Sequence, residues 1–248
     1  MYQGDLSLKR RNDHLILGRV GEHFDFAVTI SSSTTTTTKV VTVSERVNLH
    51  ATLTTPAGHI DPSIPTLLLL HYWGGSSGSF SPVVNVLSPY FPTAALSFRS
   101  WGDSTGPEEI EAYTTTNSCS DVETVIQTLG LKAVVLVGHS MGGKVAMAVA
   151  GRHVVPASIL KGLALLAPAP PGPLSIADPS MREQQLHAFD NTDNAEAVIN
   201  TYLTAQEGPA LSDELVKSIP SVVRVGLFGR GRCRRSDIPL PRSHRRFA

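Results

Sequence analysis

A short apolar run that passes directly into a glycine-flanked serine constrains this chain more than any other feature. Ala133–Val137 is followed by Gly-His-Ser-Met-Gly at 138–142 and then by the small-residue stretch Lys144–Ala150. A chain that turns this sharply holds its middle residue in a sparsely populated backbone conformation, so its neighbours must be glycines. The pattern predicts a buried strand, a tight turn at Ser140 and a helix that Gly143 lets approach the sheet. A plain strand-to-helix turn with an incidental serine is the alternative.

Further strands are predicted on both sides of this turn. Val40–Val43 and Val47–Leu53 alternate apolar with polar residues, as half-buried strands do. Short continuous apolar runs are typical of parallel strands that are buried on both faces, and this chain has three more of them: Thr66–Leu70, Ala94–Phe98 and Leu163–Leu166.

Helices are expected between these strands. Ser120 and Glu123 have the spacing of a capping box, and the helix that follows should stop at Gly130. Asp178-Pro179 is typical of an N-cap with a first-turn proline. Alternating strands and helices predict the α/β class, with a mostly parallel central sheet that has helices on both faces. Successive helices over about 175–220 predict a helical lid.

Three segments of different composition divide the chain. Residues 1–38, which end in SSSTTTTT, are expected to be a mobile N-terminal extension with a threonine-rich linker. Residues 39–223 should form the α/β domain, including the lid. Residues 224–248 carry eight arginines against a single acidic residue, Asp237, and form an atypical tail. Residues 230–248 of this tail lack helical or strand periodicity, so we expect them, like residues 1–38, to pack poorly.

Composition excludes several classes of function. Formal net charge is zero, and the longest apolar runs are too short to span a bilayer, so no membrane partner is expected. Only two cysteines occur, which rules out a disulfide framework or a cysteine-based metal site. Neither a metal nor a cofactor is expected, and the cytoplasm is the default compartment. The arginine tail could bind an anionic partner, but it has no nucleic-acid recognition motif, so none is expected.

Two further motifs accompany the turn at Ser140 in a fixed order. His-Tyr-Trp-Gly-Gly at 71–75 directly follows the strand Thr66–Leu70 and resembles an H-G-x loop, with Tyr72 in place of a glycine. Arg-Ser-Trp-Gly-Asp-Ser at 99–104 resembles an R-G-x-G-x-S turn, with Ser100 in place of its first glycine. Together with Leu-Leu-Ala-Pro at 165–168, these motifs make residues 40–220 similar to the α/β-hydrolase superfamily.

The resemblance implies a serine hydrolase, such as an esterase, that acts on esters or related small acyl substrates. Ser140 would be the nucleophile, and the backbone N–H groups of Trp73 and Met141 would form the oxyanion hole. His71 is expected to buttress its loop and not to transfer protons, and Arg99 to anchor its own loop.

The acid and base of a triad are harder to find. In this fold they follow the serine in the order acid, then histidine. His153 lies at the far end of the helix after Ser140, about 20 Å away, and His187 falls in the lid. Asp237 and His244 are separated by only six residues, too few for a helix and a strand. We expect a fold that is incomplete at its C-terminus, and the alternative function is a truncated or non-catalytic α/β-hydrolase.

Overall fold

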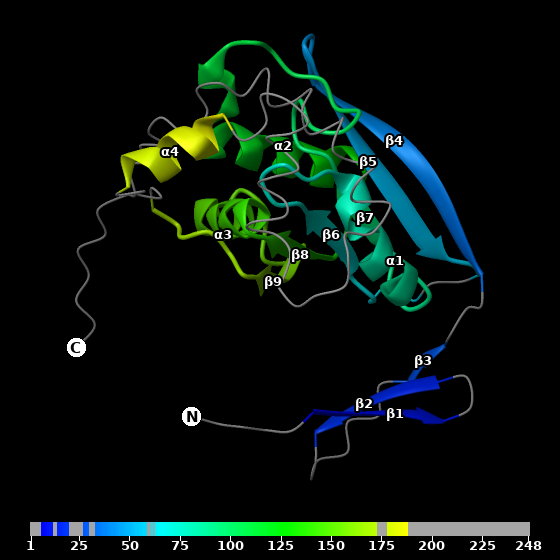
Figure 1. The fold of residues 1–248 in the computed structure, drawn as a ribbon. Coiled ribbons are helices and arrows are strands. Elements are labelled where there is room, and N and C mark those ends of the chain that lie inside the picture. Colours follow the sequence, from blue (N-terminus) through cyan, green and yellow to red (C-terminus); the bar gives the residue numbers. More distant parts are fainter. Residues whose placement is uncertain are drawn as a thin grey trace, which may run out of the picture.

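A computed structural model describes residues 6–11, 14–19, 27–29, 33–58, 61, 63–172 and 178–187. Its main element is a mixed six-stranded sheet (Figure 1). The strands lie across it in the order β4-β5-β7-β6-β8-β9. Their bounds are β4 Thr34–Ser44, β5 Val47–Pro56, β6 Thr66–Leu70, β7 Thr93–Leu96, β8 Val134–His139 and β9 Leu160–Leu166.

Four neighbouring strands of this sheet are parallel. β6 pairs in parallel with β7 and with β8, and β8 pairs in parallel with β9. β4 and β5 are antiparallel to their neighbours. The predicted mostly parallel sheet is therefore confirmed. The carboxyl ends of these four parallel strands therefore lie at the same edge of the sheet, which is where open α/β sheets bind ligands.

Helices cover both faces of the sheet, as predicted. Leu68 and Leu70 of β6 are fully buried in a core that includes Val122 of α2 (Thr115–Thr128) and Val145 of α3 (Met141–Arg152). The intervening Leu69 packs on the opposite face, in a second cluster. There it meets Phe80 of the short 3₁₀ helix η1 (Ser77–Phe80) and side chains of α1 (Ser81–Leu87). The period-two alternation of a strand thus separates two cores.

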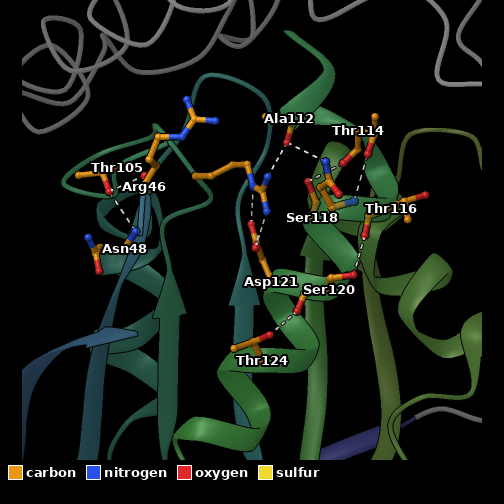
Figure 2. Close-up of polar contacts among 12 residues, drawn as sticks. Arg46, Asn48, Thr105, Ala112, Thr114, Thr116, Ser118, Ser120, Asp121 and Thr124 are labelled. Carbon is orange, nitrogen blue, oxygen red and sulfur yellow. Dashed lines mark hydrogen bonds and ion pairs between the residues drawn. The ribbon is translucent and has the colours of Figure 1, made fainter. Parts of the chain in front are cut away.

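Helix α2 begins six residues earlier than the sequence indicated, because its N-cap is Thr114 and not Ser120. The side-chain oxygen of Thr114 accepts a hydrogen bond from the Asn117 N–H at 3.1 Å. Ser120 lies inside the helix, where its hydroxyl donates to the carbonyl of Thr116, as Figure 2 shows. The predicted capping box at Ser120 is therefore wrong. Serine and threonine tolerate a helix interior when they bond back to the carbonyl four residues earlier.

The threonine run predicted to be a linker forms the first half of β4. Thr34–Thr38 pair residue by residue with Thr52–Pro56 of β5. Threonine is β-branched and fits a pleated sheet well, which outweighs the low complexity of the run. Upstream, β1 (Leu6–Arg11), β2 (His14–Arg19) and β3 (Ala27–Thr29) form a separate antiparallel sheet.

Of the helices expected over about 175–220, the structure describes α4 (Pro179–Leu186), and the others lie outside the described residues. The N-cap of α4 is Asp178, as predicted, since Oδ1 accepts from the N–H groups of Ser180 and Met181 at 2.7 and 3.1 Å. None of the helices in the described ranges is long and apolar enough to cross a bilayer. The arginine tail also lies outside these ranges.

Candidate active site

Four chain segments meet at the carboxyl edge of the parallel strands. Leu70 is in register with both Leu96 of β7 and Gly138 of β8, and His139 is in register with Leu166 of β9. Adjacent strands lie about 4.8 Å apart. The segments that follow residues 70, 96, 139 and 166 therefore emerge side by side, and the motifs that resemble the α/β-hydrolase superfamily lie in them or at the strand ends before them.

Ser140 occupies the sharp turn that the sequence predicted. It lies between the end of β8 and the start of α3, with φ 51° and ψ −112°, a conformation that is strained for a residue with a side chain. The turn is held from β9 and the segment after it. The Ser140 N–H donates to the Leu166 carbonyl at 3.0 Å, and the Ser140 carbonyl accepts from the Ala169 N–H at 2.9 Å.

The glycines around Ser140 are required by close backbone packing. A Cβ on Gly138 would lie 2.4 Å from the Gly142 carbonyl oxygen, and a Cβ on Gly142 would lie 2.0 Å from the Leu70 carbonyl oxygen. Gly142 thus lets α3 approach the sheet. A Cβ on Gly143 would instead meet the Pro168 side chain at 2.7 Å. The same Cβ would lie 3.1 Å from the Gly138 carbonyl oxygen of β8, so Gly143 also lets α3 approach the sheet, as predicted.

The loop after β6 lies beside this turn. The ring of Tyr72 meets that of His139 edge to face, with centroids 5.1 Å apart. Trp73 and Met141 pack partly buried against the same core cluster. The oxyanion role of their two amides stays a prediction, although Met141 directly follows Ser140 in the chain. Met141 opens α3, where the first N–H groups have no partner within the helix.

His71 is a structural residue, as predicted. Its side chain is fully buried, the Phe98 N–H donates to Nε2 at 3.1 Å, and Nδ1 lies 2.6 Å from the Tyr72 carbonyl. Because Nε2 accepts, the proton sits on Nδ1 and donates to Tyr72. Burial lowers the pKa of His71 from 6.5 to about 4, although the bond to the Tyr72 carbonyl acts in the opposite direction. The ring therefore stays neutral and both of its nitrogens are engaged.

Arg99 anchors the loop after β7, also as predicted. Its side chain reaches Asp121 of α2 and the carbonyl of Ala112. Sequence reasoning missed Asp121, which is a fully buried carboxylate on the apolar face of α2. The only signal in the sequence was an acidic residue directly before Val122. Ser100, which stands where the motif has glycine, adopts φ 59°, and its hydroxyl bonds to the Tyr113 hydroxyl at 2.6 Å.

Two of the histidines that the sequence analysis set aside as bases, His153 and His187, lie in the described residues. His153 follows the last residue of α3, opposite the end that begins at Ser140. His187 is exposed, and its Nε2 lies 3.0 Å from Oε1 of Glu183. Asp237 and His244 lie outside the described residues. Within the described ranges, no three histidine, cysteine or acidic side chains cluster so as to hold a metal ion.

Comparison with known proteins agrees with this geometry. The profile of the alpha/beta hydrolase fold family matches residues 65–209. Epoxide hydrolase 3 of Xenopus tropicalis is 33% identical over 93 residues, which are 38% of this chain and 25% of that protein. The chain thus spans about a quarter of this relative's length.

Solved structures share the fold at lower identity. A carboxylesterase from Bacillus subtilis aligns with TM-score 0.61 and 20% identity, over 76% of this chain and 61% of that one. A 2-hydroxy-6-oxo-6-phenylhexa-2,4-dienoate hydrolase from Rhodococcus aligns with TM-score 0.60 and 20% identity, over 80% and 72% of the two chains. With the family match covering more than half of the sequence, the chain belongs to the alpha/beta hydrolase fold family.

Proposed function

We propose that this site is that of a serine hydrolase for esters or related small acyl substrates, with Ser140 as the nucleophile. The observation that carries the proposal is the strained conformation of Ser140, φ 51° and ψ −112°, between β8 and α3. Such strain persists only where the surrounding structure enforces it, and it lifts the side chain above the edge of the sheet. Ligands of open α/β sheets bind at this edge.

The amides of Met141 and Trp73 are proposed to hold the oxyanion. Attack by the Ser140 oxygen would turn a planar carbonyl into a tetrahedral centre with negative charge on its oxygen. That charge exists only in the transition state and the intermediate, so fixed N–H donors lower the barrier selectively. The side chains of Trp73 and Met141 would then line the acyl pocket.

A serine at this position also distinguishes between the reactions that the relatives' names suggest. Serine attack on an ester displaces an alcohol and leaves an acyl ester on the enzyme, which water can hydrolyse. Attack on an epoxide would leave an alkyl ether on Ser140, which water does not cleave under mild conditions. The chemistry therefore favours acyl substrates over epoxides, although three of the curated relatives are named epoxide hydrolases.

A second candidate is a non-catalytic member of the family that binds acyl groups without turning them over. It is favoured by the histidines whose side chains are described. His71 has both nitrogens engaged, His139 turns its ring against Tyr72, and His187 bonds to Glu183. His153 lies at the far end of α3 from Ser140. His50 lies on β5, which is three strand positions from β8 in the sheet.

Hydrolysis of p-nitrophenyl acetate tests both candidates. We expect the chain to exceed its Ser140→Ala variant by no more than about tenfold, because a serine hydroxyl without a base is almost wholly protonated at pH 7. Slow transfer from this activated ester should still place an acetyl group on Ser140, and the group should accumulate and be detectable by peptide mass spectrometry, because its removal by water also needs a base. Ser118→Ala, which removes a hydroxyl of α2 that donates to the Thr114 carbonyl, is the matched control.

The outcomes separate the candidates. Acetylation of Ser140 in the parent chain and in Ser118→Ala supports the nucleophile assignment. Modification that is spread over lysines and unchanged in Ser140→Ala contradicts it. Strong turnover that depends on Ser140 eliminates the non-catalytic candidate, and alanine substitution of His187 and His244 would then identify the base.

A further inference from the structure

A buried ion pair joins the loop after β7 to helix α2. Arg99 Nε and Nη2 donate to the two carboxylate oxygens of Asp121 at 2.7 and 2.6 Å, and Nη1 donates to the Ala112 carbonyl at 2.5 Å. The side chains are 10% and 0% exposed. Figure 2 shows Asp121 and the Ala112 carbonyl facing the same guanidinium. The loop is therefore fixed to α2 and to the short helix η2 (Ile110–Tyr113) at once.

Stability alone is a weak explanation for this pair. Desolvation raises the pKa of Asp121, while its bonds to Arg99 oppose that shift. Buried ion pairs gain little over apolar residues of the same size, because both charges lose their water. A planar, bidentate pair also fixes the orientation of the two side chains, since the guanidinium meets the carboxylate in one geometry only.

The orientation of Arg99 matters because the loop after β7, which Arg99 holds in place, packs on the loop after β6. The Phe98 N–H, one residue before Arg99, donates to His71 Nε2 at 3.1 Å. Trp101, two residues after Arg99, meets the His71 ring at 5.8 Å and the Trp73 ring at 6.5 Å between centroids. The Ser97 hydroxyl oxygen also accepts from the Ser77 N–H at 3.0 Å. The loop that carries Trp73 thus takes its position from the residues on both sides of Arg99.

We propose that Arg99 and Asp121 are a positioning pair, which sets the orientation of Trp73 through Trp101 and His71. The part that concerns the Trp73 amide and Ser140 rests on the proposed function. The part that concerns the placement of the two tryptophan rings does not.

The chain offers a direct probe of this placement. Trp73 and Trp101 are its only tryptophans, and their rings are 6.5 Å apart at an interplanar angle of 70°. Indoles so close and so inclined couple excitonically, and their circular dichroism couplet depends on the angle and distance between the rings. This signal reports the geometry of the two loops without any catalysis.

The test replaces the ion pair by an apolar pair, Arg99→Met with Asp121→Leu. This change should keep the side-chain volume and the stability of the protein but lose the fixed orientation of the bidentate pair. We expect urea unfolding close to that of the parent chain, a collapsed tryptophan couplet, and Ser140 acetylation slowed about 100-fold, as for a reacting group displaced by about 1 Å. Arg99→Lys keeps the charge without the planar fork and should give the same changes.

Arg152→Lys is the matched control. Arg152 makes a similar two-pronged pair with Glu123 between α3 and α2, at 2.8 and 3.2 Å, away from both loops. The tryptophan couplet and the Ser140 acetylation rate of the Arg152→Lys variant should equal those of the parent chain.

The proposal is overturned if the apolar pair leaves the couplet and the acetylation rate unchanged. It is also overturned if both Arg99 variants fail to fold, since the pair would then be a stability element. A collapsed couplet in a folded variant supports the placement of the tryptophans, even if the parent chain shows no acetylation of Ser140. In that case the proposed function fails separately.

Discussion

Substitution of Gly142 by alanine is the most severe single-methyl change that the candidate site offers. The added Cβ would lie 2.0 Å from the Leu70 carbonyl oxygen, 2.5 Å from the Leu70 carbonyl carbon and 2.8 Å from the His71 carbonyl oxygen. All three atoms belong to the backbone of β6 and its following loop. No side chain can rotate away, so α3 must move off the sheet.

The magnitude follows from two opposing effects. Overpacking in a well-packed core costs about 1–3 kcal/mol, and backbone contacts this short place Gly142→Ala at about 3 kcal/mol. Alanine regains up to about 1 kcal/mol of helix propensity over glycine. The net destabilisation is about 2 kcal/mol, which lowers the melting temperature of a chain of this size by about 4 to 8 °C.

Gly151→Ala is the matched control. It lies in the same helix, and a Cβ there meets no atom within 4 Å, so only the propensity gain of up to about 1 kcal/mol should remain. Urea unfolding followed by circular dichroism measures both variants, and thermal scans check the ranking. If Gly142→Ala proves as stable as Gly151→Ala, the packing argument for the turn is refuted, and the strain at Ser140 needs another origin.

Two further predictions concern stability. The folded state holds His71 neutral with a pKa of about 4, against 6.5 when exposed, so the unfolded chain takes up a proton first as the pH falls. About 3 kcal/mol of stability present above pH 6.5 should therefore be lost on acidification toward pH 4, as measured by urea unfolding. His71→Gln should show a smaller loss, and an equal loss would contradict the assignment. Thr114→Ala should destabilise by about 1 kcal/mol through loss of the α2 N-cap, whereas Ser120→Ala should stay within about 0.5 kcal/mol of the parent; the reverse ranking would restore Ser120 as the cap.

Local sequence patterns predicted the turn at Ser140 well. A five-residue apolar run, two glycines at fixed spacing and a small-residue helix leave the backbone few alternatives, and β6 has the predicted bounds Thr66–Leu70. Gly130 ends α2 with φ 64°, also as expected, because a left-handed residue at a helix end favours glycine. These features depend on sterics within a few residues of one another.

Local patterns failed where tertiary pairing outweighed them. The threonine run reads as low complexity, yet β5 supplies a partner for each of its residues, and so it becomes a strand. The start of α2 was misplaced because Thr114 and Ser120 are both good caps by composition. The choice between them depends on the conformation of the segment that precedes the helix.

The sequence by itself determined the strained serine, the glycines that make room for it and the order of the three motifs. Only the tertiary structure decided which side chains surround them. The rings of His71 and Trp101 meet because β6 and β7 are neighbours in the sheet. Asp121 reaches Arg99 because α2 packs beside the loop after β7. Turn sterics act over a few neighbouring residues, whereas the partner of a buried arginine depends on strand order, which short-range propensities do not encode.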